Sequence, residues 1–202
     1  DHTLKLFEKH GMVNVGYWVP LDAKDGAGNK LIYLLEHKSR EAAAASWKSF
    51  GADPEWIKVR TASEAAGKIN EKVESVFLTA TDFSPALAQS AKGSGRVFEM
   101  RTYTLESGEL PVLTKAWESA IEERVKVSPV VAVWISEIGG LNKFCHIWPY
   151  RSLDERNNVR NQVQASGNWP PSAKAKREGG RAYRMLKQEN KIVMPSAFSP
   201  LK

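Results

Sequence analysis

Two segments of this chain alternate so that polar and aromatic side chains gather on one face. Successive side chains of a strand point to opposite faces, so every second residue shares a face. The shared face carries an acid, a base, a guanidinium group and phenols, which could hold a small molecule or assist proton transfer. The residues are Glu99, Arg101 and Tyr103 in residues 97–105, and His146, Trp148 and Tyr150 in residues 143–150.

These residue types fit two kinds of site. In an enzyme, His146 would act as the base, and Arg101 and Tyr103 would stabilise a developing oxyanion. The protein would then be a cofactor-independent oxygenase or isomerase. In a binding protein, the same side chains would line a cavity for a small apolar or aromatic ligand. A barrel filled by side chains would contradict both versions.

We expect this face to point into a cavity between two packed sheets. Residues 30–37 contribute Tyr33 and His37 to the same ligand-binding set. The opposite face, with Cys145 and Ile147, is small and aliphatic and suits packing beneath helices. On this reading, Cys145 is a core residue rather than a reactive thiol.

Structural roles compete with each of these site predictions. Glu99 and Arg101 lie two residues apart and could form an ion pair with each other. His146 aligns with Tyr33, so the position could simply require a planar ring. We expect His10 to interact with the C-terminus of a helix rather than to bind a metal ion or another ligand.

The sequence predicts no metal site and no cofactor. The chain has four histidines, and none is spaced from a second ligand in a known metal-binding pattern. The Gly93-Ser94-Gly95 stretch precedes a strand, whereas phosphate-binding loops open a helix. The chain also lacks the G-x-S-x-G motif of serine nucleophiles.

Composition indicates a globular protein of one large or two small cores. The chain has 202 residues, 42% of them hydrophobic, and a formal charge of +6. The net charge favours an anionic partner, but basic and acidic residues are mixed, so we expect no nucleic-acid binding. No apolar stretch is long enough to span a membrane. We expect a cytoplasmic protein, with a targeting segment before Asp1, periplasmic or mitochondrial, as the open alternative.

The chain nearly repeats itself, which predicts its domain organisation. Asn29-Lys30 and the strand after it reappear at Asn142-Lys143, and the same spacing joins Trp56 to Trp169. We expect a first unit at residues 1–85, a linker at 86–96 and a second unit at 97–202.

The second unit reads as β-α-β-β-α-β, the ferredoxin-like order. Ser152 begins a capping box with Glu155. The expected elements are strands at 97–105, 130–137, 143–150 and 191–194, and helices at 110–126, from 153, and 172–178.

The first unit follows the same order without its opening strand. We expect a helix to residue 10, strands at 12–19, 30–37 and 73–79, a helix capped by Ser39 and a segment opened by Pro54. The missing strand would leave unpaired backbone on both sides. We therefore expect the natural protein to begin on the order of 20–30 residues earlier.

Three stretches resemble the NIPSNAP family over nearly the whole chain. Residues 98–105 with Gly108-Glu109-Leu110 resemble its opening motif, and residues 141–156 resemble its second signature. Residues 6–12 with 16–20 resemble the first unit of members with two copies, a form more typical of bacterial members.

The resemblance implies an α+β fold in which two ferredoxin-like units pack sheet to sheet as a dimeric α/β barrel. It implies no settled activity. A small-molecule ligand, a protein partner or a homodimer would each be compatible with the family. Eukaryotic members are linked to mitochondria and to protein interactions, including the recruitment of autophagy machinery.

Overall fold

A computed structural model describes residues 2–87 and 96–202 of the chain. Most of the predicted linker at 86–96 lies outside the described residues. The architecture is α+β and contains one curled, antiparallel sheet of seven strands. The strands are β1 (Val13–Pro20), β2 (Ile32–Glu36), β3 (Phe77–Ala80), β4 (Val97–Leu105), β5 (Ala132–Ile138), β6 (Lys143–Tyr150) and β7 (Met185–Pro195).

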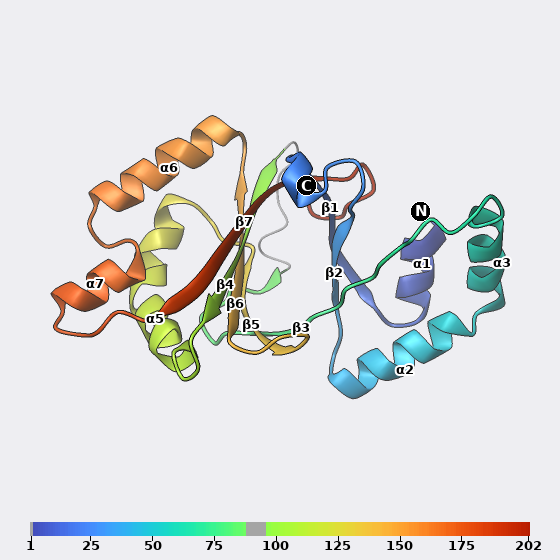
Figure 1. Cartoon of the computed structure of the whole chain (residues 1–202), viewed down its shortest axis with the longest axis horizontal. Coiled ribbons are helices and arrows are strands. Elements are labelled where there is room, and N and C mark those ends of the chain that lie inside the picture. Colours follow the sequence, from blue (N-terminus) through green and yellow to red (C-terminus); the bar gives the residue numbers. More distant parts are fainter. Residues whose placement is uncertain (1, 88–95) are drawn as a thin grey trace.

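Helices cover the outer faces of this curled sheet (Figure 1). Those from the second half of the chain lie on one side, and those from the first half lie on the other. The helices are α1 (His2–Lys9), α2 (Arg40–Gly51), α3 (Pro54–Ser63), α5 (Leu110–Val127), α6 (Leu153–Ala165) and α7 (Pro171–Arg177), with a short 3-10 helix at Ala23–Asp25.

The strand order has a ferredoxin-like core. The second half of the chain forms the order β7-β4-β6-β5, in which the opening strand β4 lies between β7 and β6. The first half adds β1 and β2 beside β7, and β3 beside β5. Both halves therefore belong to one sheet, and β2 and β3 form its two edges. This is the predicted barrel-type fold of two packed ferredoxin-like units.

Local sequence signals explain several boundaries. The Ser152 side chain accepts a hydrogen bond from the Glu155 N–H at the start of α6, and Ser39 caps α2 in the same way. The strands predicted at residues 97–105 and 143–150 match β4 and β6. The final strand is longer than the predicted 191–194, because β7 pairs with β4 over nearly its whole length.

The interior of the curled sheet is filled by apolar side chains. Trp18 is 0% exposed and packs edge-on against Phe98, which joins the first half of the chain to the second. Gly16 makes room for this ring, since a Cβ there would lie 2.2 Å from Trp18 Cη2. The full interior cluster is Trp18, Phe98, Val131, Ala132, Trp134, Ile147, Val193 and Leu201.

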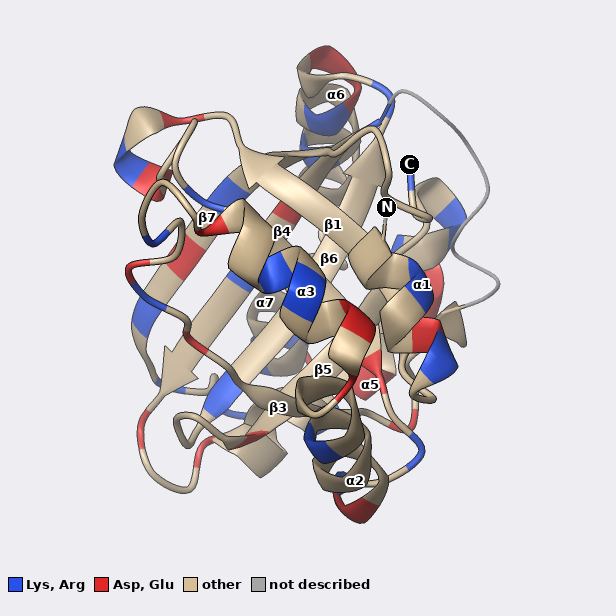
Figure 2. Ribbon diagram, turned by 90° about the vertical axis from the view of Figure 1, so that its right-hand side faces the viewer, with Lys and Arg blue, Asp and Glu red and all other residues tan. Residues whose placement is uncertain are grey.

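Charged residues are mixed over the face formed by α1, α2 and α3. Figure 2 shows short basic and acidic segments following one another along these helices. None of the described helices is both long and apolar enough to cross a membrane.

Candidate functional site

The polar face of β4 and β6 packs beneath the helices rather than inside the curled sheet. Tyr103, Trp148 and Tyr150 share a buried cluster with Trp117 of α5. Our expectation that this face lines the cavity between the sheets is wrong. Cys145 and Ile147, expected beneath the helices, belong to the interior cluster or pack against it.

The reason for the reversal lies in the composition of the two faces. Both faces of β6 are rich in apolar side chains. Alternation along the strand therefore separates its residues into two sets but does not show which set packs against the helices. Large aromatic rings fill the space between the sheet and α5. The Trp117 ring centroid lies 4.7 Å from that of Phe144 and 4.6 Å from that of His146.

The carboxylate of Glu99 is held by arginines of α6. The residue is 1% exposed, and its Oε1 accepts a hydrogen bond from Arg156 Nη2 at 2.5 Å. Arg160 Nη1 lies 3.8 Å from the same oxygen. Its Oε2 has no hydrogen-bond partner among the described residues. The expected ion pair between Glu99 and Arg101 does not form in the structure.

His146 is held in a defined tautomer. The indole Nε1–H of Trp148 donates to His146 Nδ1 at 2.5 Å. An indole can only donate, so Nδ1 is an acceptor, and the neutral ring carries its hydrogen on Nε2. This Nε2–H has no acceptor among the described residues, although the side chain is only 1% exposed.

Burial keeps the His146 ring neutral. Desolvation lowers the pKa of His146 well below its ordinary value, and Arg101, Arg124 and Arg160 lower it further. Burial also raises the pKa of Tyr103 to about 12, so its phenol stays protonated. The cluster therefore offers hydrogen-bond donors at neutral pH.

Arg124 of α5 completes the cluster, and our sequence reasoning missed it. Its guanidinium carbon lies 3.9 Å from the centroid of the Trp148 ring, and its Nη2 donates to the Tyr150 hydroxyl at 3.2 Å. The residue is only 5% exposed, and desolvation lowers its pKa. Its sequence context, Glu122 to Lys126, looks like a solvated charge run. Its spacing of seven residues from Trp117 was the signal that it lies on the buried face.

The cluster carries more positive than negative charge. Four guanidinium groups face one carboxylate, that of Glu99, while His146 is neutral. No carboxylate of residues 2–87 or 96–202 forms an ion pair with Arg101 or Arg124. The guanidinium groups are those of Arg101, Arg124, Arg156 and Arg160.

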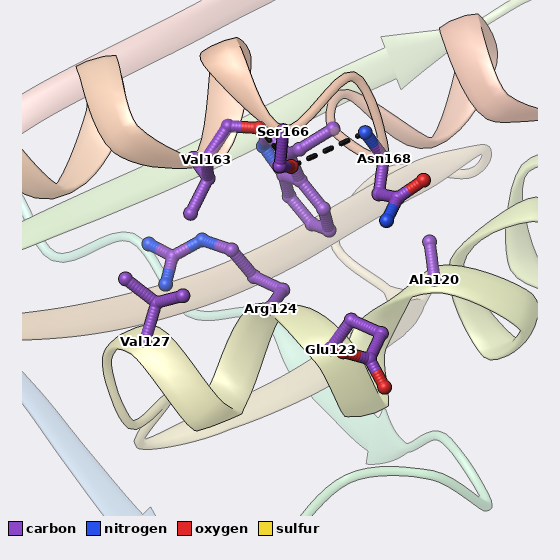
Figure 3. A pocket seen from close by; sticks show the side chains of 8 residues that line it. Ala120, Glu123, Arg124, Val127, Val163, Ser166 and Asn168 are labelled. Carbon is purple, nitrogen blue, oxygen red and sulfur yellow. Dashed lines mark hydrogen bonds between the residues drawn. The ribbon is translucent and has the colours of Figure 1, made fainter.

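Two cavities border this cluster. Figure 3 shows the first, of about 110 Å³, between α5 and α6, with Arg124 reaching between Val127 and Val163. Trp169 also lines it. The second, of about 300 Å³, is bordered by Val127, by Tyr150 and by the ends of β6 and α5. Arg124 touches the first cavity and bonds to Tyr150 of the second, so it connects the two.

Tyr33 and His37 lie elsewhere, in the first half of the chain, where Tyr33 is 40% exposed and His37 is half-buried. The Tyr33 ring stacks on Tyr17 with centroids 5.6 Å apart. The His37 and Trp47 centroids are 6.5 Å apart, and burial lowers the pKa of His37. The structure thus divides the predicted ligand-binding set between two clusters. Its six residues from β4 and β6 come together, and the other two do not join them.

His10 has a structural partner at the end of α1. Its Nε2 lies 2.8 Å from Asp53 Oδ2, and Lys9 Nζ lies 2.7 Å from the same oxygen. Asp53 also caps α3 by accepting from the Glu55 N–H. His10 Nδ1 lies 2.9 Å from Ser49 Oγ of α2. This network ties α1 to α2 and α3.

Within the described part of the chain, no group of three or more His, Cys, Asp or Glu side chains could hold a metal ion. Three tryptophans that could dock a protein partner do not form one patch, because Trp47 and Trp56 lie beside Phe50 and Trp169 lies beside Trp117. Trp47 is the most exposed of the three.

Sequence comparison identifies relatives over most of the chain. The NIPSNAP family model matches residues 1–85 and 98–200. A NipSnap homologue of Dictyostelium discoideum is 31% identical over 81% of this chain and 69% of its own length. NipSnap of Drosophila melanogaster is 28% identical over 73% of this chain. A putative NipSnap protein of Caenorhabditis elegans is 24% identical over 86%. The chain spans 50% and 31% of these last two proteins.

Two solved structures are similar to parts or all of this chain. A NIPSNAP family protein of unknown function from Agrobacterium tumefaciens is 34% identical over 56% of this chain and 99% of its own, with a TM-score of 0.45. A putative monooxygenase of Fusobacterium nucleatum covers 100% of this chain and 85% of its own, with a TM-score of 0.54. At 10% identity this second likeness concerns the fold alone. On the family match across both halves of the sequence, the chain belongs to the NIPSNAP family.

Proposed function

We propose that this protein binds a small molecule between its sheet and helices α5 and α6, in the cluster around His146 and Arg124. One observation carries the proposal. Glu99 and His146 are both 1% exposed, and each keeps a polar atom without a partner among the described residues. Leaving such atoms unpaired costs about 1–3 kcal/mol each, so a ligand or ordered water that pairs with them is favoured.

The surroundings support a binding site at this place. Arg124 reaches from the cluster into a cavity, and aromatic rings form the walls. By contrast, Trp18, Phe98 and Trp134 fill the interior of the curled sheet, which contradicts a ligand or a reaction in the cavity between the sheets, as both interpretations first required. A ligand there would have to displace packed rings, which is unfavourable. The proposed site therefore lies in a different place, beneath α5 and α6.

The enzyme reading is the weaker alternative. Two solved structures with this fold are described as putative monooxygenases, and both are 10% identical to this chain. A base at His146 needs a free lone pair. Trp148 occupies Nδ1, and Nε2 carries the hydrogen, so the neutral ring acts as a donor. A protein-binding role is a further alternative, for which Trp47 is the exposed aromatic residue.

Native mass spectrometry of protein purified gently from its own organism tests the proposal. We expect a small bound mass that is retained by the wild type and lost on His146→Ala or Arg101→Ala. The matched control is Lys115→Gln, which removes an exposed charge from α5. A bound mass that survives both variants, or no bound mass in any preparation, would contradict the proposal.

A further inference from the structure

We infer that the ligand of this site is an organic anion, namely a carboxylate carried on a small planar body. The inference rests on the proposed function and specifies its ligand class. It follows from three features of the cluster: its charge, the polarity of its unpaired atoms and the nature of its walls.

The charge of the cluster is unbalanced. Glu99 forms ion pairs with Arg156 and Arg160. Arg101 and Arg124 therefore have no carboxylate partner in the described ranges. Arg124 is 5% exposed, so solvent compensates its charge poorly. Its guanidinium donates to the Ser128 carbonyl and the Tyr150 hydroxyl and lies over the Trp148 ring, but none of these neutral groups carries an opposing charge. A buried charge is stable only when it is paired and hydrogen-bonded. A bound anion would supply that partner.

The unpaired atoms are mostly donors. The Nε–H groups of Arg101 and Arg156 lack acceptors, as does the Nε2–H of His146. One acceptor, Glu99 Oε2, is also unpaired. These residues do not line either cavity, so a ligand reaches their atoms only by entering the cluster past Arg124. A carboxylate has only acceptors, two oxygens with about four lone-pair sites, and therefore matches this excess of donors. Its bonds to guanidinium groups are charge-assisted, and so are stronger than those of a neutral amide.

The walls and the available space restrict the rest of the ligand. Trp148 and Trp169 flank the guanidinium of Arg124, with ring centroids 3.9 Å and 5.7 Å from it. The cavity between α5 and α6 has a volume of about 110 Å³, which suits a small ligand. Arg124 is the arginine of the cluster that lines it, and Glu123 lies on the same wall, so the carboxylate must bind at the Arg124 end. Inorganic phosphate fits these walls less well, because a more highly charged ion loses more hydration on entering an aromatic site.

Matched pairs of ligands test the inference on the complete chain. Saturation-transfer NMR would compare benzoate with benzamide, cinnamate with cinnamamide, and nicotinate with nicotinamide, together with titration of inorganic phosphate as a competitor. We expect at least one carboxylate to bind at least tenfold more tightly than its amide. Arg124→Gln should remove most of that preference, and Lys115→Gln should leave it unchanged. Circular dichroism checks that each variant is folded. If Arg124→Gln does not fold, Arg101→Gln replaces it, because Arg101 is the second arginine of the cluster without a carboxylate partner in the described ranges.

The outcomes separate this inference from the proposed function. If an amide binds as tightly as its carboxylate, the site exists but its ligand is not selected by charge, and the inference is wrong. If phosphate displaces every carboxylate at lower concentration, the ligand is an anion of another class, and the inference is also wrong. If no member of any pair binds while native mass spectrometry still shows a retained mass, the site takes a ligand of another class, and the inference is wrong. If neither method detects a ligand, the proposed function itself is contradicted.

Discussion

At the scale of single residues, the site depends on how one histidine is oriented. Trp148 lies two residues after His146 on β6, and its indole fixes the ring by donating to Nδ1. A fixed tautomer turns a residue that usually exchanges protons into a permanent donor at Nε2. The chemistry expected of His146 from sequence, that of a base, is replaced by recognition of an acceptor.

His146 should therefore remain neutral over the physiological range. Burial lowers the pKa of His146 well below its ordinary value, so the ring should be uncharged at neutral pH. Nitrogen-15 NMR of the imidazole should show the Nε2–H tautomer throughout. The variant Trp148→Phe should release Nδ1 and allow the other tautomer. A wild-type ring that titrates near pH 6.5 would contradict this assignment.

Glu99 should contribute strongly to stability. Replacing it by glutamine removes the charge that compensates Arg156 and Arg160 beneath α6. Breaking a buried pair on one side costs about 3 kcal/mol, whereas an exposed pair contributes less than about 1 kcal/mol. We expect urea denaturation to show this loss for Glu99→Gln. Glu122→Gln, at an exposed pair with Lys126, should change little. Equal effects would mean that the Glu99 pair is not buried in solution.

At the scale of elements, α1, α2 and α3 are held together by side chains at their ends. Hydrogen bonding from Lys9, and then from His10, holds the pKa of Asp53 below its usual value. A carboxylate with a depressed pKa stabilises the fold above its unfolded pKa of about 3.9 and loses that contribution as the pH falls through its folded value.

Asp53→Asn should therefore lower the melting temperature by a few degrees at pH 7, and the difference should shrink as the pH falls below about 4. Thermal unfolding followed by circular dichroism across this range measures the effect. The control is Asp22→Asn, at an exposed pair with Lys24. A difference that stays constant with pH would show that the carboxylate charge is not what ties these helices together.

The sequence predicted where the helices and strands lie better than it predicted which face of each strand packs against the helices. β4, β6 and the Ser152 cap match closely because alternation and capping are local signals. Which face of β4 and β6 meets the helices depends on the sheet as a whole, and local alternation carries no information about it. Arg124, Arg156 and Arg160 were missed because helical arginines among acidic residues are typical of solvated surfaces.

At the scale of the whole molecule, the two halves of the chain share one sheet and one interior cluster. β7 pairs with β1, and β5 pairs with β3, so neither half completes its hydrogen bonding alone. Trp18 from the first half packs on Phe98 from the second. The division at residues 86–96 therefore remains a prediction about sequence units rather than about independent folding.

We expect a single cooperative unfolding transition for this reason. Trp18→Ala should destabilise the molecule by about 3–5 kcal/mol, since it empties a fully buried ring site, and should keep the transition single. Differential scanning calorimetry measures both quantities. Two separate transitions in the wild type would contradict a shared core.

The central claim is that the ligand lies beneath α5 and α6 and not inside the curled sheet. The indole N–H signals of the tryptophans report on both places in one two-dimensional NMR spectrum. On adding the best-binding carboxylate, we predict shifts for Trp148 and Trp169, beside Arg124, while Trp18 and Trp134 of the interior cluster stay in place. Shifts confined to Trp18 and Trp134 would place the ligand in the barrel interior and contradict the account.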